Sequence, residues 1–173
     1  MSASISTSAI FGLRALERGT TADYANWATC MLEEGHDSRN LRILAGLDSF
    51  TSTFEAKDYF SKAVTELAIV EPSREAAIRG YAAFLVERML DKTLSQKMAV
   101  KMLSNLCYSS NYPEYLMRWY NLEDALSDVI NGYEPWSRRG LTRENAGTII
   151  EQEARVFLQE MADYRTDPST GSG

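Results

Sequence analysis

Hydrophobic residues along this chain recur with the spacing of α-helices. From residue 24 to residue 32 they fall at positions i, i+3, i+4, i+7 and i+8, which places them on one stripe of a helix. No segment shows the alternation of polar and apolar residues that marks a half-buried strand. We therefore expect an all-α fold of about seven helices, over residues 23–34, 38–47, 54–67, 73–90, 93–106, 113–131 and 142–161.

Residues that start or stop helices bound several of these segments. Asp23 is expected to cap the first helix, and Gly35 to end it in a left-handed conformation. Pro72 fits the first position of a helix, where its missing N–H is not needed. Thr93 and Gln96 match a capping box, and Thr142 is expected to cap the last helix.

The connections between these helices are short, which predicts antiparallel neighbours. The helix at 73–90 is apolar on two sides and is therefore expected to form the spine of the core. The helix pairs at 23–47, 54–90 and 95–130 are typical of stacked hairpins of the HEAT type. An irregular helical bundle fits equally well, because no residue signature recurs at a fixed period.

The length of 173 residues and the composition suit one soluble globular domain. We expect this all-helical domain to cover residues 21–165. Residues 1–20 form an N-terminal segment with room for a short helix. The polar, glycine-containing end at 166–173 is interpreted as a flexible tail or cloning scar.

Charge and cysteine usage limit the partners and the compartment. The chain has 18 Lys and Arg against 24 Asp and Glu, a net charge of −6, which disfavours direct nucleic-acid binding and favours a basic partner. Two cysteines are too few for a disulfide framework. The N-terminus lacks the pattern of a signal peptide, and no apolar run has the length of a membrane span. A cytoplasmic protein without membrane contact is expected.

Enzyme and metal motifs are absent from the sequence, and we expect neither a catalytic residue, a cofactor nor a metal. His36, the single histidine, is interpreted as a turn residue beside Gly35. Cys30, His36 and Cys107 include zinc-ligand types, but their spacing matches no ligand pattern, and both cysteines adjoin apolar stripes. Packing in the core is therefore the favoured role of the cysteines.

The stretch from residue 119 to residue 136 combines four acids and four large aromatic residues with no Lys or Arg, and thus holds four of the six net negative charges. Asp128 follows Asp124 by one helical turn, a like-charge spacing that costs about 0.2–0.5 kcal/mol. Aromatic anchors with unpaired acids suit a surface that binds a basic protein. Alternatively, Trp119 and Trp136 pack into the core and leave a solvated acidic rim. The predicted binding residues are Trp119, Tyr120, Glu123, Asp124, Asp128, Tyr133, Glu134 and Trp136.

Four segments carry a resemblance to known proteins: WATCMLEEGHDSRNLRILAGL at 27–47, FEAKDYFSKAVTELAI at 54–69, PSREAAIRGYAAFLVERML at 72–90 and EDALSDVINGY at 123–133. Together they resemble a group of small all-helical bacterial proteins, mostly uncharacterised. Some of these resemble immunity proteins of contact-dependent or polymorphic toxin systems. The resemblance spans residues 23–164 and transfers no individual functional residue.

The resemblance implies a non-enzymatic protein that binds a cognate toxin domain and occludes its active site, with a basic nuclease as the expected toxin class. A helical adaptor that holds a peptide or helix is the alternative, and it predicts an exposed apolar groove. A hydrolase with paired carboxylates, drawn from acids such as Glu33 and Glu34 or Glu151 and Glu153, predicts a deep pocket and a shifted carboxyl pKa.

Overall fold

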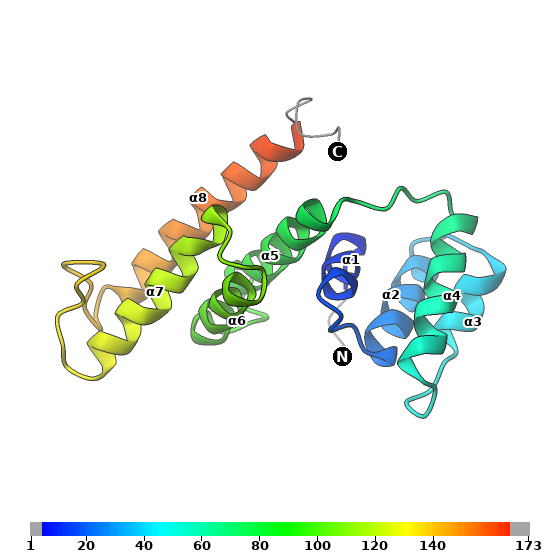
Figure 1. Cartoon of the computed structure of the whole chain (residues 1–173), viewed down its shortest axis with the longest axis horizontal. Helices are drawn as coiled ribbons and strands as arrows, with labels where there is room; N and C mark the ends of the chain where they lie inside the picture. Colours follow the sequence, from blue (N-terminus) through cyan, green and yellow to red (C-terminus); the bar gives the residue numbers. More distant parts are fainter. Residues whose placement is uncertain (1–4, 167–173) are drawn as a thin grey trace. The chain divides into compact units, whose positions relative to one another are not determined.

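The computed structural model describes residues 5–166 of the chain, which contain eight α-helices and no strand (Figure 1). The all-α prediction is confirmed. Residues 1–4 and 167–173 lie outside the described part, so the predicted tail is described only at its first residue, Thr166. The helices are α1 (Thr7–Ala15), α2 (Thr21–Glu33), α3 (Arg39–Ala45), α4 (Thr53–Glu66), α5 (Arg74–Leu90), α6 (Gln96–Ser109), α7 (Glu114–Ile130) and α8 (Ala146–Thr166).

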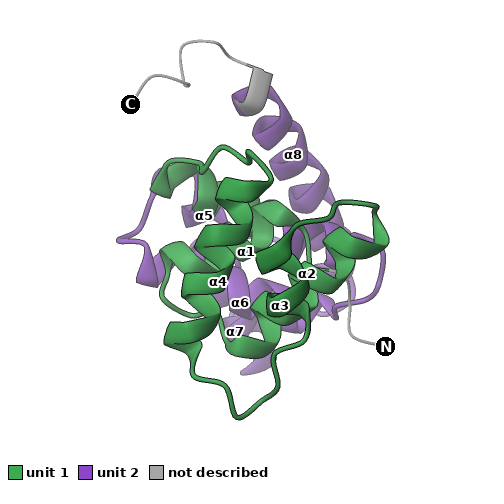
Figure 2. Cartoon of the chain, turned by 90° about the vertical axis from the view of Figure 1, so that its right-hand side faces the viewer, with its two compact units in different colours: residues 1–81 green, residues 82–173 purple. Residues whose placement is uncertain are grey.

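The all-helical domain divides into two compact units, residues 1–81 and residues 82–173 (Figure 2). The boundary falls inside α5, the helix that the sequence marks as apolar on two sides. Its buried residues occur before and after the boundary: Ala77, Ile78, Ala82, Ala83, Leu85, Val86 and Met89.

In unit 1, helices α2, α3 and α4 pack against one another, and α1 packs on α2. The centre of this unit is Phe60 of α4. The ring centroids of Trp27, Tyr24 and Phe11 lie 4.8, 5.1 and 5.4 Å from that of Phe60. All four rings are buried, so the amphipathic stripes of three helices converge on one aromatic cluster.

The N-terminal segment belongs to the core of unit 1, because α1 buries Ile10 and Phe11. Two glycines allow α1 to approach the start of α5. A Cβ at Gly12 would lie 2.3 Å from the Cβ of Tyr81, and one at Gly80 would lie 2.9 Å from the Cβ of Ser8. Gly80, the one helix breaker inside α5, is therefore explained by close helix packing.

Helix α2 ends where its glycine predicts but begins earlier than predicted. Gly35 adopts a φ of +90° directly after α2, as predicted, and His36 N donates to Met31 O, which makes His36 the last residue of a Schellman turn. At the other end of α2, Thr20 is the capping residue and Asp23 is its capping-box partner. Asp23 accepts from the Thr20 N–H at 2.8 Å, so the helix begins earlier than predicted.

Two other predicted starts are wrong by a few residues. α5 begins at Arg74, since Ser73 Oγ accepts from Ala76 N, and Pro72 lies before the helix. α6 is capped by Ser95, and Thr93 instead donates its hydroxyl to Arg88 O at the end of α5. In both places a serine close to the predicted residue supplies the capping oxygen.

Unit 2 contains the hairpin of α6 and α7, joined by residues 110–113, and α8 lies beside α7 (Figure 1). Trp119 of α7 meets Phe157 of α8 edge to face, with ring centroids 5.7 Å apart. Thr142 opens a turn of reciprocal hydrogen bonds with Asn145 that leads into α8 at Ala146. The long segment 131–145 connects α7 to α8.

Candidate functional site

The predicted binding residues divide into buried and exposed groups. Trp119 is fully buried between α7 and α8, and its Nε1 has no acceptor among the described residues. Trp119 therefore packs in the core, as the alternative interpretation of the sequence expects, and its ring is not accessible to a partner. Trp136 is 88 % exposed, Tyr133 70 % and Tyr120 38 %, so these three aromatic side chains are accessible.

We call six of the predicted residues, which are exposed or half-buried, the aromatic–acidic surface: Tyr120, Asp124, Asp128, Tyr133, Glu134 and Trp136. Asp124 and Asp128 follow Tyr120 by one and two turns on the same side of α7. Asp124 is exposed and Asp128 is half-buried. No ion pair joins either aspartate to a cation within residues 5–166, so both charges remain available to a partner.

The end of α7 places Tyr133 on this surface. Gly132 has a φ of +84°, Tyr133 N donates to Asp128 O at 2.9 Å, and Gly132 N donates to Val129 O at 3.2 Å. This is a Schellman turn, which turns the chain sharply at the end of the helix. The Arg143 guanidinium also donates to Val129 O and Ile130 O, so it neutralises the negative end of the helix.

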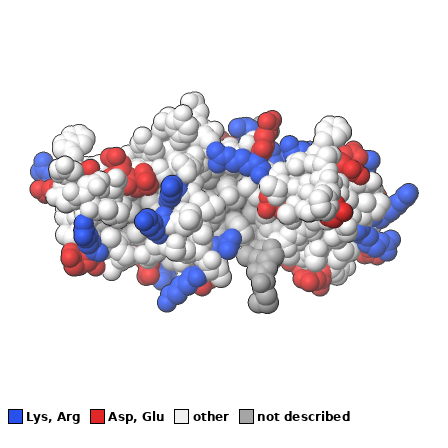
Figure 3. All heavy atoms as spheres, turned by 90° about the horizontal axis from the view of Figure 1, so that it is seen from below, with Lys and Arg blue, Asp and Glu red and all other residues white. Residues whose placement is uncertain are grey.

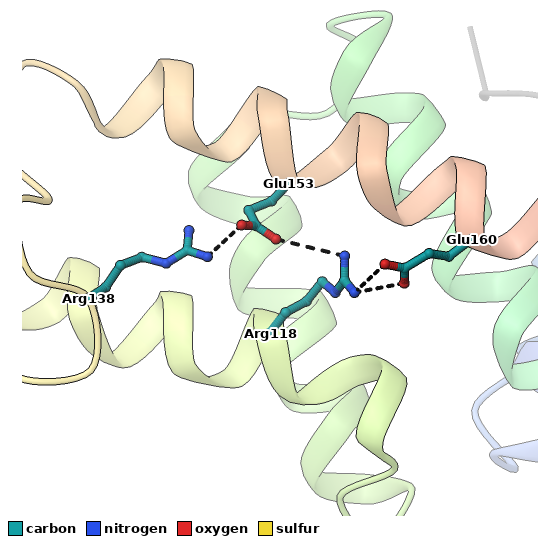
Figure 4. Close-up of polar contacts among 4 residues, drawn as sticks. All are labelled: Arg118, Arg138, Glu153 and Glu160. Atoms are coloured by element: carbon teal, nitrogen blue, oxygen red, sulfur yellow. Dashed lines mark hydrogen bonds and ion pairs between the residues drawn. The ribbon is translucent and has the colours of Figure 1, made fainter.

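A network of ion pairs holds the segment that carries Trp136 (Figure 4). Arg138 in the segment donates to Glu153 of α8 at 2.5 Å, and Glu153 also pairs with Arg118 of α7 at 3.8 Å. Arg118 Nη2 in turn donates to both carboxylate oxygens of Glu160, at 2.7 and 2.8 Å. The buried side chains of Pro135 and Leu141 add apolar contacts. Trp136 is therefore displayed by a braced segment.

The other two acids of the predicted site have cations beside them. Glu123 is half-buried in a groove that Lys97, Lys101 and Arg143 also line. Glu134 shares a shallow pocket of about 250 Å³ with Arg139 and Trp136. Basic and acidic side chains also lie close together on the face of the molecule in Figure 3. A charge count over residues 119–136 misses these cations, because Arg139 and Arg143 lie just beyond residue 136 and the two lysines come from α6.

Two further tyrosines of unit 2, Tyr108 and Tyr112, are exposed, and neither belongs to the binding residues predicted from the sequence. The ring of Tyr112 lies 5.8 Å from that of Tyr108 and 5.4 Å from that of Tyr120, both in edge-to-face geometry. Tyr112 has a φ of 54°, which is rare for an aromatic residue, and the two ring contacts offset its strain. Partial burial, followed by the effect of Tyr120, raises the pKa of the Tyr112 hydroxyl.

Metal ligands do not come together in the structure. Cys30 and His36 belong to unit 1 and Cys107 to unit 2. Within residues 5–166, no three Asp, Glu, His or Cys side chains gather as a metal site would require. Cys107 is buried 3.8 Å from the Met117 sulfur, and burial raises the pKa of its thiol. It packs as a small apolar side chain.

Three carboxyl groups have shifted pKa values, and in each case the pKa is lowered. Hydrogen bonds from Ser38 and Asn40 lower that of Glu66, bonds from Thr93 lower that of Asp91, and a bond from its own backbone N–H lowers that of Glu144. A general acid needs the opposite shift, toward neutral pH. None of the three lines the groove at Glu123 or the pocket at Glu134.

Comparisons with known proteins add no relative. Between residues 5 and 166, no helix combines the length and the apolar character needed to cross a membrane. No protein-family model matches the sequence, and neither a curated protein nor a solved structure does so.

Proposed function

We propose that this chain is a non-enzymatic binding protein that contacts its partner through the aromatic–acidic surface. The observation that carries the proposal is the exposure of Trp136 and Tyr133, 88 % and 70 %, at the end of a helix and on a braced segment. Trp and Tyr dominate the binding energy of protein interfaces. A braced segment loses little backbone conformational entropy on binding, which lowers the cost of contact through the residues that it carries.

The charges on the surface favour a basic partner. Asp124 and Asp128 repel each other along α7, a spacing that costs about 0.2–0.5 kcal/mol of helix stability. This repulsion is relieved when a partner places Lys or Arg beside them. Opposite charges across an interface mainly raise the rate of association and select among partners.

Toxin neutralisation is the specific form of this proposal. It rests on the resemblance of the helical segments to a group of small helical bacterial proteins, some of which resemble immunity proteins, and on the charge complementarity expected between an acidic surface and a basic nuclease. Carboxylates on the surface would occupy the positions that nucleic-acid phosphates take in the toxin, and Trp136 would anchor the complex. This function places the protein in the cytoplasm, where an incoming toxin acts.

The test is co-expression of the chain with the toxin domain encoded beside its own gene. We expect a complex on size exclusion and protection in a growth assay. The paired substitution Tyr133→Ala with Trp136→Ala should weaken the complex about 100-fold, because two anchors are removed. Phe50→Ala with Phe54→Ala is the matched control, since these rings are 93 % and 83 % exposed in unit 1. Equal loss in both variants would contradict the proposal.

A second pair of variants tests the charge. Asp124→Lys with Asp128→Lys should slow association and remove much of its salt dependence. Glu33→Lys with Glu34→Lys makes the same change of net charge at two exposed positions in unit 1 and should leave association unchanged. If the two charge variants behave alike, net charge is responsible and the surface is not.

A further inference from the structure

Unit 2 also has a groove whose lining combines apolar side chains with mainly positive charges, in contrast to the aromatic–acidic surface. It has a volume of about 400 Å³ and lies among α6, the C-terminal half of α7 and the start of α8. Its lining is mainly apolar: Val100, Leu126, Val129, Ile130, Ala146 and Ile150. Binding sites for small molecules have this size and this apolar character, with a few polar groups that orient the ligand.

The charged groups of the groove are mostly cationic. Lys97 and Lys101 lie one turn apart on α6, both are exposed, and no ion pair joins either of them to an acid of the described chain. Arg143 adds a third positive charge, although its guanidinium is bonded to the carbonyls at the end of α7. Glu123 is the one acid in the lining, so positive charge prevails.

The groove has a hydrogen bond between two of its helices and an exposed apolar edge. Gln96 Nε2 donates to Gly147 O at 3.2 Å, and this contact joins α6 to the first turn of α8. Ile130 lines the groove while 58 % of its surface is exposed, whereas Val100 and Ile150 are buried. A ligand that covers Ile130 removes apolar surface from water, and its polar group then meets the lysines of α6.

We propose that this groove binds a small amphiphilic anion, an apolar chain or ring that carries a carboxylate. The apolar part fills the space over Val100 and Ile150, and the carboxylate pairs with Lys97 and Lys101. The site is separate from the aromatic–acidic surface, and its occupation does not depend on the proposed toxin partner.

Octanoate is the probe, with 1-octanol as the neutral control, each titrated into the full chain and followed by ¹H–¹⁵N NMR. We expect saturable shifts confined to amides of 96–101, 123–130 and 143–150, and about tenfold tighter binding of octanoate than of octanol. Lys97→Gln with Lys101→Gln should weaken octanoate binding about tenfold and change octanol binding less than twofold.

Two further variants complete the test. Lys57→Gln with Lys92→Gln makes the same charge change outside the groove and should leave octanoate binding unchanged. Ser127→Trp places a large ring in the groove at an exposed lining position and should abolish binding of both probes while the amide spectrum stays folded. Shifts scattered over the chain, equal affinity for octanol, or binding of an acidic amphipathic peptide without binding of octanoate would each overturn the proposal.

Discussion

The two units use aromatic side chains in opposite ways. In unit 1, Phe11, Tyr24, Trp27 and Phe60 gather into one buried cluster around Phe60. Among the described residues of unit 2, Trp119 and Phe157 form a buried ring pair, while five large aromatic residues are exposed: Tyr108, Tyr112, Tyr120, Tyr133 and Trp136. Aromatic side chains thus build the core of unit 1, whereas in unit 2 five of them are exposed on the surface.

Exposure alone does not separate the two roles, because unit 1 also exposes Phe50 and Phe54. Phe50 lies at a turn where Asp48 accepts from the N–H groups of Phe50 and Thr51, and Phe54 lies in the first turn of α4. What distinguishes Trp136 is the combination of exposure with neighbouring acids and a segment that Arg138 joins to α8 and Arg143 joins to the end of α7. Phe50 and Phe54 are therefore useful controls for effects of apolar exposure in general.

Removal of the central ring of unit 1 should have the largest effect on stability. Phe60→Ala is expected to lower the free energy of unfolding by about 3–5 kcal/mol, because three rings lose their common partner and a cavity remains. Urea unfolding followed by the fluorescence of buried Trp27 measures this change. Phe54→Ala, an exposed ring on the same helix, should shift the free energy by less than about 0.5 kcal/mol. Similar losses in the two variants would refute the assignment of Phe60 as the core centre.

The second prediction concerns alkaline pH. Burial is the main cause that raises the pKa of Tyr24 to about 12, while Arg14 lowers this pKa and Asp23 raises it by smaller amounts. The unfolded chain releases this proton near the ordinary value of 10.0, so the raised pKa makes stability fall as pH rises from 10 to 12. The loss is at most about 3 kcal/mol. Urea unfolding at pH 9, 10 and 11 measures it.

Tyr24→Phe is the control for the alkaline prediction. The Tyr24 hydroxyl is buried and has no hydrogen-bond partner among the described residues, so its removal should not destabilise the fold at pH 7. The variant should show a shallower decline of stability above pH 10. The same decline with and without this hydroxyl would assign the effect to other groups.

Local signals predicted the features that depend on neighbouring residues in the chain. The apolar stripes located α2 to α8 but not α1, and Gly35 and Gly132 end α2 and α7 in left-handed turns. The spacing of apolar residues along α7 also indicates that Trp119 is buried. Trp119, Leu122 and Ala125 recur every third residue on one side of the helix, and all three are buried. Composition favoured Trp119 as a surface anchor, but periodicity indicates the core.

Features that depend on the meeting of distant segments could not be predicted in this way. Tyr108 and Tyr120 lie on two different helices and meet only through Tyr112 in the turn between them. Lys97 and Lys101 reach the groove of Glu123 from α6, so a charge count along residues 119–136 omits them. The position of Trp136 depends on burial of Pro135 and on the pair of Arg138 with Glu153.

The variant with the smallest expected effect on stability, Trp136→Phe, gives the most direct test of the contrast between the buried rings of unit 1 and the exposed rings of unit 2. Trp27 and Trp119 are fully buried, whereas Trp136 is 88 % exposed, so one of the three indoles should account for most of the quenching by acrylamide. Trp136→Phe should remove that quenchable, red-shifted emission and change the free energy of unfolding by less than about 0.5 kcal/mol. Glu153→Gln is the complementary variant, because it weakens the brace through Arg138 and leaves the indole in place. If quenching of the unsubstituted protein is as weak as that of Trp136→Phe, Trp136 is covered in solution and the aromatic–acidic surface is not available to a partner.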